Sequence, residues 1–149
     1  MNQSFNIMLA FLGGVFLAAQ GGLNARLGVH LKSPFLASLI AFGFSACFAL
    51  IIVIVSAREL PRTAQLTGIP IYLWFTGALF SVLGICLYYY TIPKLGLSTM
   101  ISLGLFGQLL FSAIAGHFGW FGLPQEPLEF NRLFGIVAMA FGIVMINKT

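Results

Sequence analysis

Charge is scarce in this chain of 149 residues: Asp, Glu, Lys and Arg together make up 7% of it, and only three residues are acidic. Soluble domains carry about a quarter of such residues, and a globule with so few would have to expose large apolar patches. Disordered chains are polar and highly charged, so disorder is excluded as well. Because 60% of the residues are hydrophobic, the composition predicts an integral membrane protein.

Motifs for enzymatic chemistry are also absent. The sequence has no GxxxxGK[ST] phosphate-binding loop, no HExxH zinc motif and no Ser/His/Asp arrangement. Its two cysteines, Cys47 and Cys86, lie in separate apolar runs without a CxxC pair, so they indicate packing residues and not a disulfide or a metal site. We therefore expect no enzyme, no catalytic residue, no cofactor and no metal. The basic residues are scattered and not clustered, so no nucleic-acid partner is expected either.

Five apolar segments are present, and crossing a bilayer takes about 20 residues in each. No Lys or Arg precedes the first, which favours a mature helix over a signal peptide. Ser33-Pro34 supplies an N-cap and a first-turn proline for the second. The predicted fold is an all-α integral membrane protein, with residues 1–149 forming one membrane domain and helices at about 5–25, 34–57, 70–92, 97–116 and 132–146.

An odd number of spans puts the two termini on opposite sides of the membrane. The basic residues then divide almost evenly between the sides. One side carries Arg58, Arg62 and Arg132, and the other carries Arg26, Lys32, Lys94 and Lys148. Since cytoplasmic loops are normally richer in Lys and Arg, this balance gives no preferred orientation. Either the rule is weak here and the helix boundaries are displaced, or the chain inserts both ways and pairs with an inverted copy, as inverted-repeat transporters do within one chain.

Small residues recur at about four-residue spacing on several helices, which favours close helix packing in lipid. The stripes are Ala10, Gly14, Ala18 and Gly22; Ala37, Ala41, Ser45 and Ala49; Gly77, Ser81 and Gly84; and Gly135, Ala138 and Gly142.

Polar residues inside spans point to function, because each needs a partner or a wet cavity. Gln20 and Asn24 lie one turn apart on the first helix, and Arg26 follows. Gln108 lies midway along the fourth helix, and Tyr88-Tyr89-Tyr90 closes the third with at least one ring facing the bundle. Interhelical hydrogen bonding, at about 0.6 kcal/mol each, explains the amides as well as a role in lining a substrate path does. Arg26 equally suits a charge that reaches to the interface.

All three acidic residues, Glu59, Glu126 and Glu129, fall in predicted loops. No predicted span therefore carries a carboxylate for exchanging protons against a cation.

Several motifs together resemble the small YdcZ-type inner-membrane exporters of the drug/metabolite transporter superfamily. They run along essentially the whole chain: Gln20-Gly21-Gly22-Leu23-Asn24-Ala25-Arg26-Leu27-Gly28, Ser33-Pro34-Phe35, Pro93, Gly96, Gly107-Gln108, His117-Phe118-Gly119, Phe121-Gly122, Arg132, Gly135 and Gly142. One position departs from the family pattern: an acidic residue is expected before His117-Phe118-Gly119, and this chain has Gly116.

The resemblance implies a five-helix half-unit in a bacterial inner membrane, paired as an antiparallel ten-helix homodimer or with a related chain. We expect a small-molecule exporter that works by alternating access at a midplane cavity within membrane lipid. Its candidate lining residues are Gln20, Asn24, Arg26, Phe42, Tyr88 and Gln108, with Arg26 favouring an anionic or zwitterionic solute. The alternatives are a dual-topology anion channel and a non-transporting subunit that pairs with a paralogue.

Overall fold

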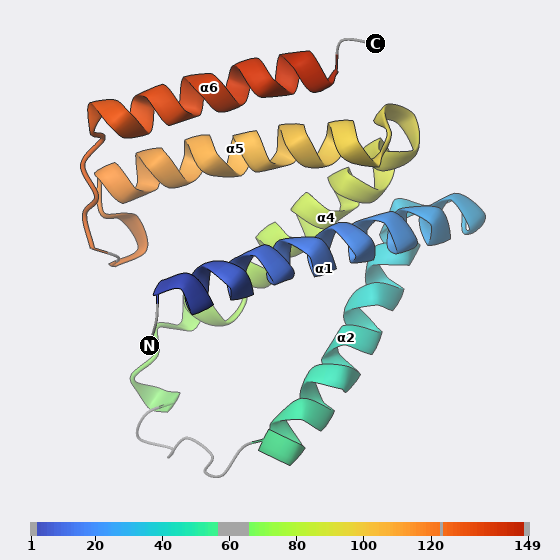
Figure 1. Ribbon diagram of the computed structural model, residues 1–149. Helices are drawn as coiled ribbons and strands as arrows, with labels where there is room; N and C mark the ends of the chain where they lie inside the picture. The colour runs from blue at the N-terminus through green and yellow to red at the C-terminus, as the bar shows by residue number, and fades with distance from the viewer. Residues whose placement is uncertain (1–2, 57–65, 123, 148–149) are drawn as a thin grey trace. The chain divides into compact units, whose positions relative to one another are not determined.

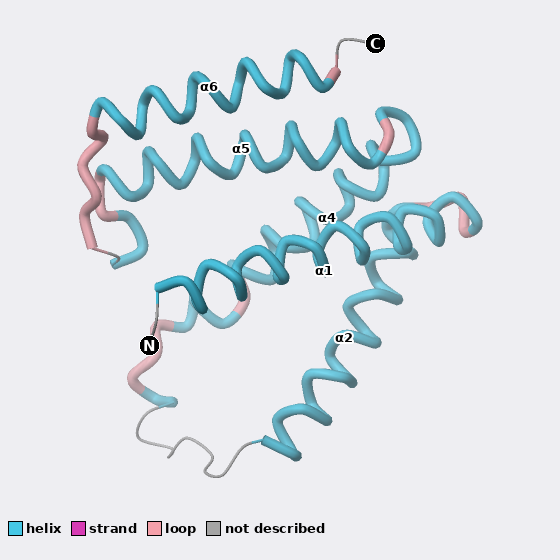
Figure 2. Tube along the Cα trace, viewed as in Figure 1, coloured by secondary structure: helices cyan, strands magenta, loops and turns pink. Residues whose placement is uncertain are grey.

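The computed structural model describes residues 3–56, 66–122 and 124–147, and over these residues the chain is helical with no β-strand (Figure 1, Figure 2). The expected all-α class is confirmed. The α-helices are α1 Gln3–His30, α2 Pro34–Ser56, α4 Thr76–Leu95, α5 Leu97–His117 and α6 Phe130–Ile146, and the 3-10 helices are η1 Ile71–Trp74 and η2 Trp120–Gly122.

Four of these segments are long and apolar enough to cross a membrane: α1, α2, the segment Ile71–Leu95 that joins η1 to α4, and α5. The fifth helix, α6, is apolar but has 17 residues. At the helical rise it measures about 25 Å, against a hydrocarbon core of ~30 Å. A fifth span therefore requires local thinning of the bilayer at α6.

The chain divides into two compact units, Met1–Lys94 and Leu95–Thr149. The first contains α1, α2, η1 and α4, and the second contains α5, η2 and α6. Three residues of the predicted charge balance, Arg58, Arg62 and Lys148, lie outside the described residues, as does Glu59, which was predicted to lie in a loop.

The turn between α1 and α2 is built by backbone hydrogen bonds. The N–H of Ser33 donates to the Gly28 carbonyl at 3.0 Å, and the N–H of Lys32 donates to Val29 at 3.1 Å. Lys32 has a left-handed φ of 52°, so these bonds form a Schellman motif that ends α1. The N–H of Leu36 donates to Ser33 Oγ at 3.2 Å, which confirms the predicted N-cap of α2.

α1 is longer than the sequence suggests, since it continues past Ala25 to His30. Helix α4 continues through Pro93 to Leu95 instead of ending at position 92. Both extensions have a local reason. The segment after Ala25 has no proline before the Schellman turn, and only two residues of α4 follow Pro93.

The closest approach of α1 and α2 is made by small residues next to the turn. A Cβ placed on Gly28 would lie 3.5 Å from the Ala37 Cβ and 3.6 Å from the Pro34 Cα. Ala25 and Ala37 are almost fully buried. The buried stripe on α1 is therefore Gly21, Ala25 and Gly28. The predicted stripe from Ala10 to Gly22 has no buried member, because the helix presents the neighbouring face to its partners within the unit.

In the second unit α5 and α6 lie side by side and run antiparallel (Figure 1, Figure 2). Ile136 and Ile143 of α6 are buried, as are Met100 and Ala113 of α5. The loop 118–129 joins the two helices and includes η2.

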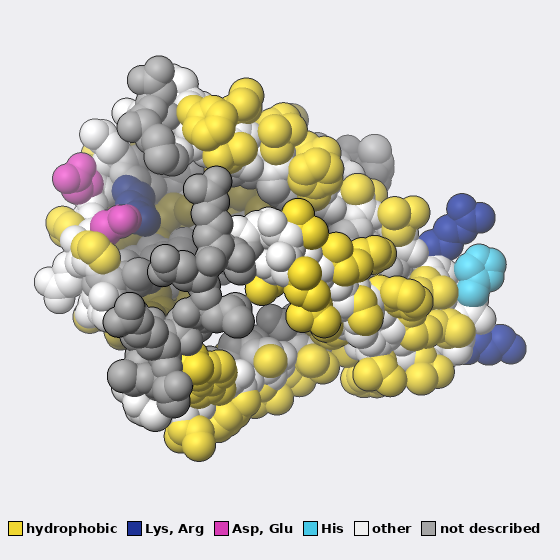
Figure 3. Space-filling view, turned by 90° about the horizontal axis from the view of Figure 1, so that it is seen from below, with side chains coloured by type: hydrophobic (Ala, Val, Ile, Leu, Met, Phe, Trp, Pro, Cys, Tyr) yellow, Lys and Arg dark blue, Asp and Glu magenta, His cyan; other side chains and the backbone are white. Residues whose placement is uncertain are grey.

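Apolar side chains remain exposed over most of each helix. Within the most apolar 18-residue stretch of each candidate span, only 6–11% of the stretch is buried inside the protein. Every residue from 43 to 56 on α2 is exposed. Figure 3 shows hydrophobic side chains covering long stretches of the visible surface. In water such surface would aggregate, so it is suited to contact lipid or further transmembrane helices.

Replacing Gly28 by leucine should destabilise the first unit, because the added side chain has no room between Ala37 and Pro34. Overpacking of this kind typically costs about 1–3 kcal/mol. Thermal unfolding of the purified protein in detergent measures the change. Gly13→Leu is the matched control on the same helix, since a Cβ there meets nothing within 4 Å in the described part of the chain. Equal losses in the two variants would contradict the packing described here.

Candidate functional site

A polar cluster joins α1 to α4 inside the apolar segments. The amide of Asn24 donates to the Tyr89 hydroxyl at 2.9 Å, and the amide of Gln20 approaches the same oxygen at 3.5 Å. Tyr89 is 2% exposed and is the largest fully buried side chain among the described residues. Three uncharged polar groups from two candidate spans therefore converge on one oxygen atom.

The register of α1 explains why both amides reach the same ring. Gln20 and Asn24 lie one helical turn apart, so they share a face. On the adjoining residue, a Cβ at Gly21 would lie 3.5 Å from the Ile92 side chain. Gly21 therefore faces the Ile92 side chain of α4 at the level of the cluster.

Pro93 adds a backbone acceptor to this region. In a regular helix the N–H of residue 93 would donate to the carbonyl of Tyr89, but proline has no N–H. Helix α4 nevertheless continues through this position. The Tyr89 residue therefore brings both a hydroxyl and a carbonyl that lacks its usual helical donor.

A second buried contact ties α4 to α2 one turn before Tyr89. The Ser38 hydroxyl donates to the Phe35 carbonyl at 2.9 Å and lies 3.1 Å from the Cys86 sulfur. Because the serine proton is used by the carbonyl, the thiol is the donor toward Ser38. Cys86 is buried and Cys47 is exposed, and both are free thiols, so Cys86 acts as a packing residue with one polar contact.

The structure brings together some of the residues expected to line a substrate path. Gln20 and Asn24 both contact the hydroxyl of Tyr89. The predicted Tyr88 is half-buried on an adjoining face of α4. Phe42 is half-buried on α2. Arg26 is exposed, and its position after Asn24 turns it to another face of α1. Gln108 is exposed on α5 in the second unit.

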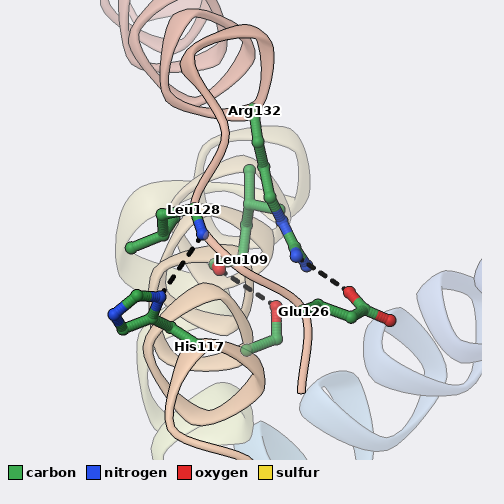
Figure 4. Close-up of polar contacts among 6 residues, drawn as sticks. Leu109, His117, Glu126, Leu128 and Arg132 are labelled. Carbon is green, nitrogen blue, oxygen red and sulfur yellow. Dashed lines mark hydrogen bonds and ion pairs between the residues drawn. The ribbon is translucent and has the colours of Figure 1, made fainter. Parts of the chain in front are cut away.

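The second unit has a charged site where α5 ends and α6 begins (Figure 4). Arg132 Nη1 donates to Glu126 Oε2 at 2.8 Å. The backbone N–H of Leu128 donates to His117 Nδ1 at 3.3 Å, and the N–H of Glu126 donates to the Gly116 carbonyl at 2.9 Å. The loop is thus attached to the last turn of α5 and holds the carboxylate near α6.

Glu126 also fills the space beside Gly116, the position where the resemblance led us to expect an acidic residue. A Cβ on Gly116 would lie 3.7 Å from the Glu126 Cβ and 3.9 Å from its Oε2. The carboxylate next to position 116 therefore comes from the loop. Sequence spacing gave no sign of this, because Glu126 is ten positions away in a segment without regular periodicity.

The two sites differ in the groups that they offer. The α1–α4 cluster has neutral amides and a phenol, which bind by hydrogen bonding, and the α5–α6 site has one ion pair. Over the described ranges, no three His, Cys, Asp or Glu side chains are grouped so that they could hold a metal ion.

Comparison with known proteins agrees with a membrane transporter. Residues 5–145 match the family DMT_YdcZ, described as "Putative inner membrane exporter, YdcZ". No curated protein and no solved structure matches the chain. The match covers most of the chain and includes all five α-helices, four of which are long enough to span a membrane. The protein is therefore a multi-pass membrane protein that belongs to the YdcZ inner-membrane exporter family.

Proposed function

We propose that this chain is one half of an exporter for a small anionic or zwitterionic metabolite or drug-like solute, working by alternating access in the bacterial inner membrane. The observation that carries the proposal is the Asn24–Tyr89–Gln20 cluster, a set of uncharged hydrogen-bonding groups within apolar helices. A polar group within an apolar span is costly unless it has a hydrogen-bonding partner or faces a water-filled cavity. Such a group therefore indicates either helix packing or a solute path.

The cluster has bonding capacity to spare. A phenol hydroxyl both accepts and donates hydrogen bonds, and here its oxygen accepts the Asn24 amide at 2.9 Å and is approached by the Gln20 amide at 3.5 Å. Within the described part of the chain, hydrogen bonds occupy neither the hydroxyl proton nor the two amide oxygens, and these are the groups that we propose for the solute. A solute with both donors and acceptors fits this set. Phe42 and Tyr88 are proposed as its apolar and aromatic walls, Gln108 as a further amide, and Arg26 as the cationic group that favours an anion.

The cluster lies in the half of α1 nearer its C-terminal end. Along the axis, Gln20 is about 15 Å and Asn24 about 9 Å from His30. A single copy therefore offers its polar groups toward one face of the membrane. An inverted second copy would place an equivalent cluster in the other half, which gives the symmetry that alternating access requires.

Three features support an antiparallel homodimer. A single chain of this size is too small to enclose a path with access to both sides. Its Lys and Arg residues are balanced between the two predicted faces, so neither orientation is favoured. The small-residue stripes of α4 and α6 have no close neighbour in their own units, since Gly77, Gly84, Gly135 and Gly142 meet nothing within 4 Å there. Such faces allow close helix contact in lipid.

Transport in proteoliposomes tests the function. Four labelled probes cover the solute classes: leucine as zwitterion, benzoate as anion, tetraphenylphosphonium as cation and sucrose as neutral solute. We expect saturable exchange of the zwitterion or the anion and none of the cation. Rapid conductive flux without saturation would indicate an anion channel and not a carrier. The absence of flux of every probe with the purified single chain would contradict the proposal.

Tyr89→Phe and Asn24→Leu should each lower exchange of the transported probe about tenfold, the loss expected from one hydrogen-bonding interaction of ~1.4 kcal/mol. Asn6→Leu is the matched control, because it makes the same change on an exposed part of α1. Thermal unfolding of each variant separates a lost solute contact from lost stability. If Tyr89→Phe exchanges the probe at the wild-type rate, the cluster does not line the path.

Dual topology can be tested by labelling one exposed position. In a background with Cys47 and Cys86 replaced by alanine, Lys32→Cys should react with a membrane-impermeant maleimide from both sides of the membrane, in similar amounts. Lys32 is exposed in the α1–α2 turn, so access does not limit the reaction. Labelling from one side only would exclude the antiparallel pair.

A further inference from the structure

A pocket of about 330 Å³ lies in the second unit, where α5, η2 and the start of α6 meet. Aromatic and small residues form most of its wall, and its charged groups are the partners of the ion pair. It is lined by Phe111, Ser112, Ala115, Gly116, Phe121, Pro124, Glu126 and Arg132. The pocket is therefore apolar with one cation and one anion.

The aromatic side of the pocket is organised by ring contacts. Phe111 packs against Phe121 with centroids 6.2 Å apart and against Trp120 at 6.0 Å. Phe121 has a left-handed φ of 62°, a backbone conformation that bulky residues rarely adopt. The turn thus holds the Phe121 ring at the pocket despite a conformational cost.

The two charged partners are not equally accessible. The Arg132 side chain is 30% exposed and the Glu126 side chain is 64% exposed. Arg132 also lies in the first turn of α6, where the helix dipole disfavours a cation. The guanidinium is therefore the group that depends on a counter-anion, whereas Glu126 can turn into solvent at little cost.

Their bond is easily exchanged. The ion pair has one contact, Nη1 to Oε2, although a guanidinium has five N–H groups and binds carboxylates through two parallel bonds. Exposed pairs of this kind contribute about 0–1 kcal/mol. An incoming anion that makes two bonds would therefore compete well with Glu126.

We propose that this pocket binds an amphipathic organic anion, with its carboxylate or phosphate on Arg132 and its apolar part against Phe111 and Phe121, and that Glu126 is a built-in competitor that the ligand displaces. The ligand class follows from the Arg132 guanidinium, which lines the pocket together with the rings of Phe111 and Phe121. Binding here does not require transport. The pocket belongs to the second unit, whereas the Asn24–Tyr89–Gln20 cluster belongs to the first.

Benzoate is the probe, because it joins a carboxylate to one aromatic ring, and benzamide is its neutral counterpart. Its binding to the full chain in detergent is measured by calorimetry and by the thermal midpoint, which rises when a ligand binds the folded state. We expect benzoate to bind and raise the midpoint, and benzamide to do neither.

Variants at the two charged positions should change the benzoate affinity in opposite directions. Arg132→Gln should weaken benzoate binding at least about tenfold, and Arg132→Lys should also weaken it because lysine lacks the planar fork. Glu126→Gln should tighten binding several-fold by removing the competitor. Glu129→Gln is the matched control, since this glutamate lies in the same loop and makes no side-chain cap on α6.

Titrations in phosphatidylcholine and phosphatidylglycerol nanodiscs distinguish two sources of the anionic group. Weaker apparent benzoate affinity in phosphatidylglycerol would show that a lipid headgroup reaches Arg132, and equal affinities would assign the site to a soluble anion. Both results support an anion site. Equal benzoate binding by wild type and Arg132→Gln would overturn it, as would a Glu126→Gln variant that binds benzoate no better than Glu129→Gln. Failure here leaves the transport assay unaffected, because that assay reads flux and the α1–α4 cluster.

Discussion

Hydrocarbon offers no hydrogen bonds, so each polar group carried into the membrane must find its partner within the protein, and the contact between Asn24 and Tyr89 is where the first unit meets this requirement. The small residues near that contact lie where the helices pack together. Gly21 of α1 faces the Ile92 side chain of α4, and Gly28 of α1 packs against Ala37 of α2. The Ser38–Cys86 contact completes the connection between α2 and α4. A few hydrogen bonds and close approaches thus hold three long helices whose remaining surfaces are apolar and exposed.

The two units use polar groups differently. In the first, the polar groups of the α1–α4 cluster are neutral: two amides that contact one phenol oxygen. In the second, the charges lie where helices end, and the loop from Gly116 to Arg132 pairs them across a small pocket. This division follows from solvation: a charge inside the bilayer is far more expensive than a neutral amide.

Local signals predicted local structure well. Ser33-Pro34 indicated the start of α2, and the N–H of Leu36 does bond to the Ser33 hydroxyl. The spacing of Gln20 and Asn24 indicated one shared face, which the structure confirms. The choice among Tyr88, Tyr89 and Tyr90 was beyond the sequence, because consecutive helical residues point about 100° apart and only the rotation of α4 against α1 selects one. The same holds for the small stripe on α1, where the buried face is the neighbour of the predicted one. Glu126 was missed because an irregular loop has no period from which its position beside Gly116 can be inferred.

The sequence by itself determined the solvent, the secondary structure and the family: its hydrophobicity and low charge require lipid, its apolar runs form helices, and its motifs match the YdcZ exporters. These are properties of composition and of neighbours in the chain. Only the tertiary structure decided which polar side chains meet, namely Tyr89 with Asn24 and Gln20, and Glu126 with Arg132. The contacts of Tyr89 join residues more than sixty positions apart and depend on the rotation and approach of whole helices. The contact of Glu126 with Arg132 joins residues six positions apart and depends on the path of an irregular loop.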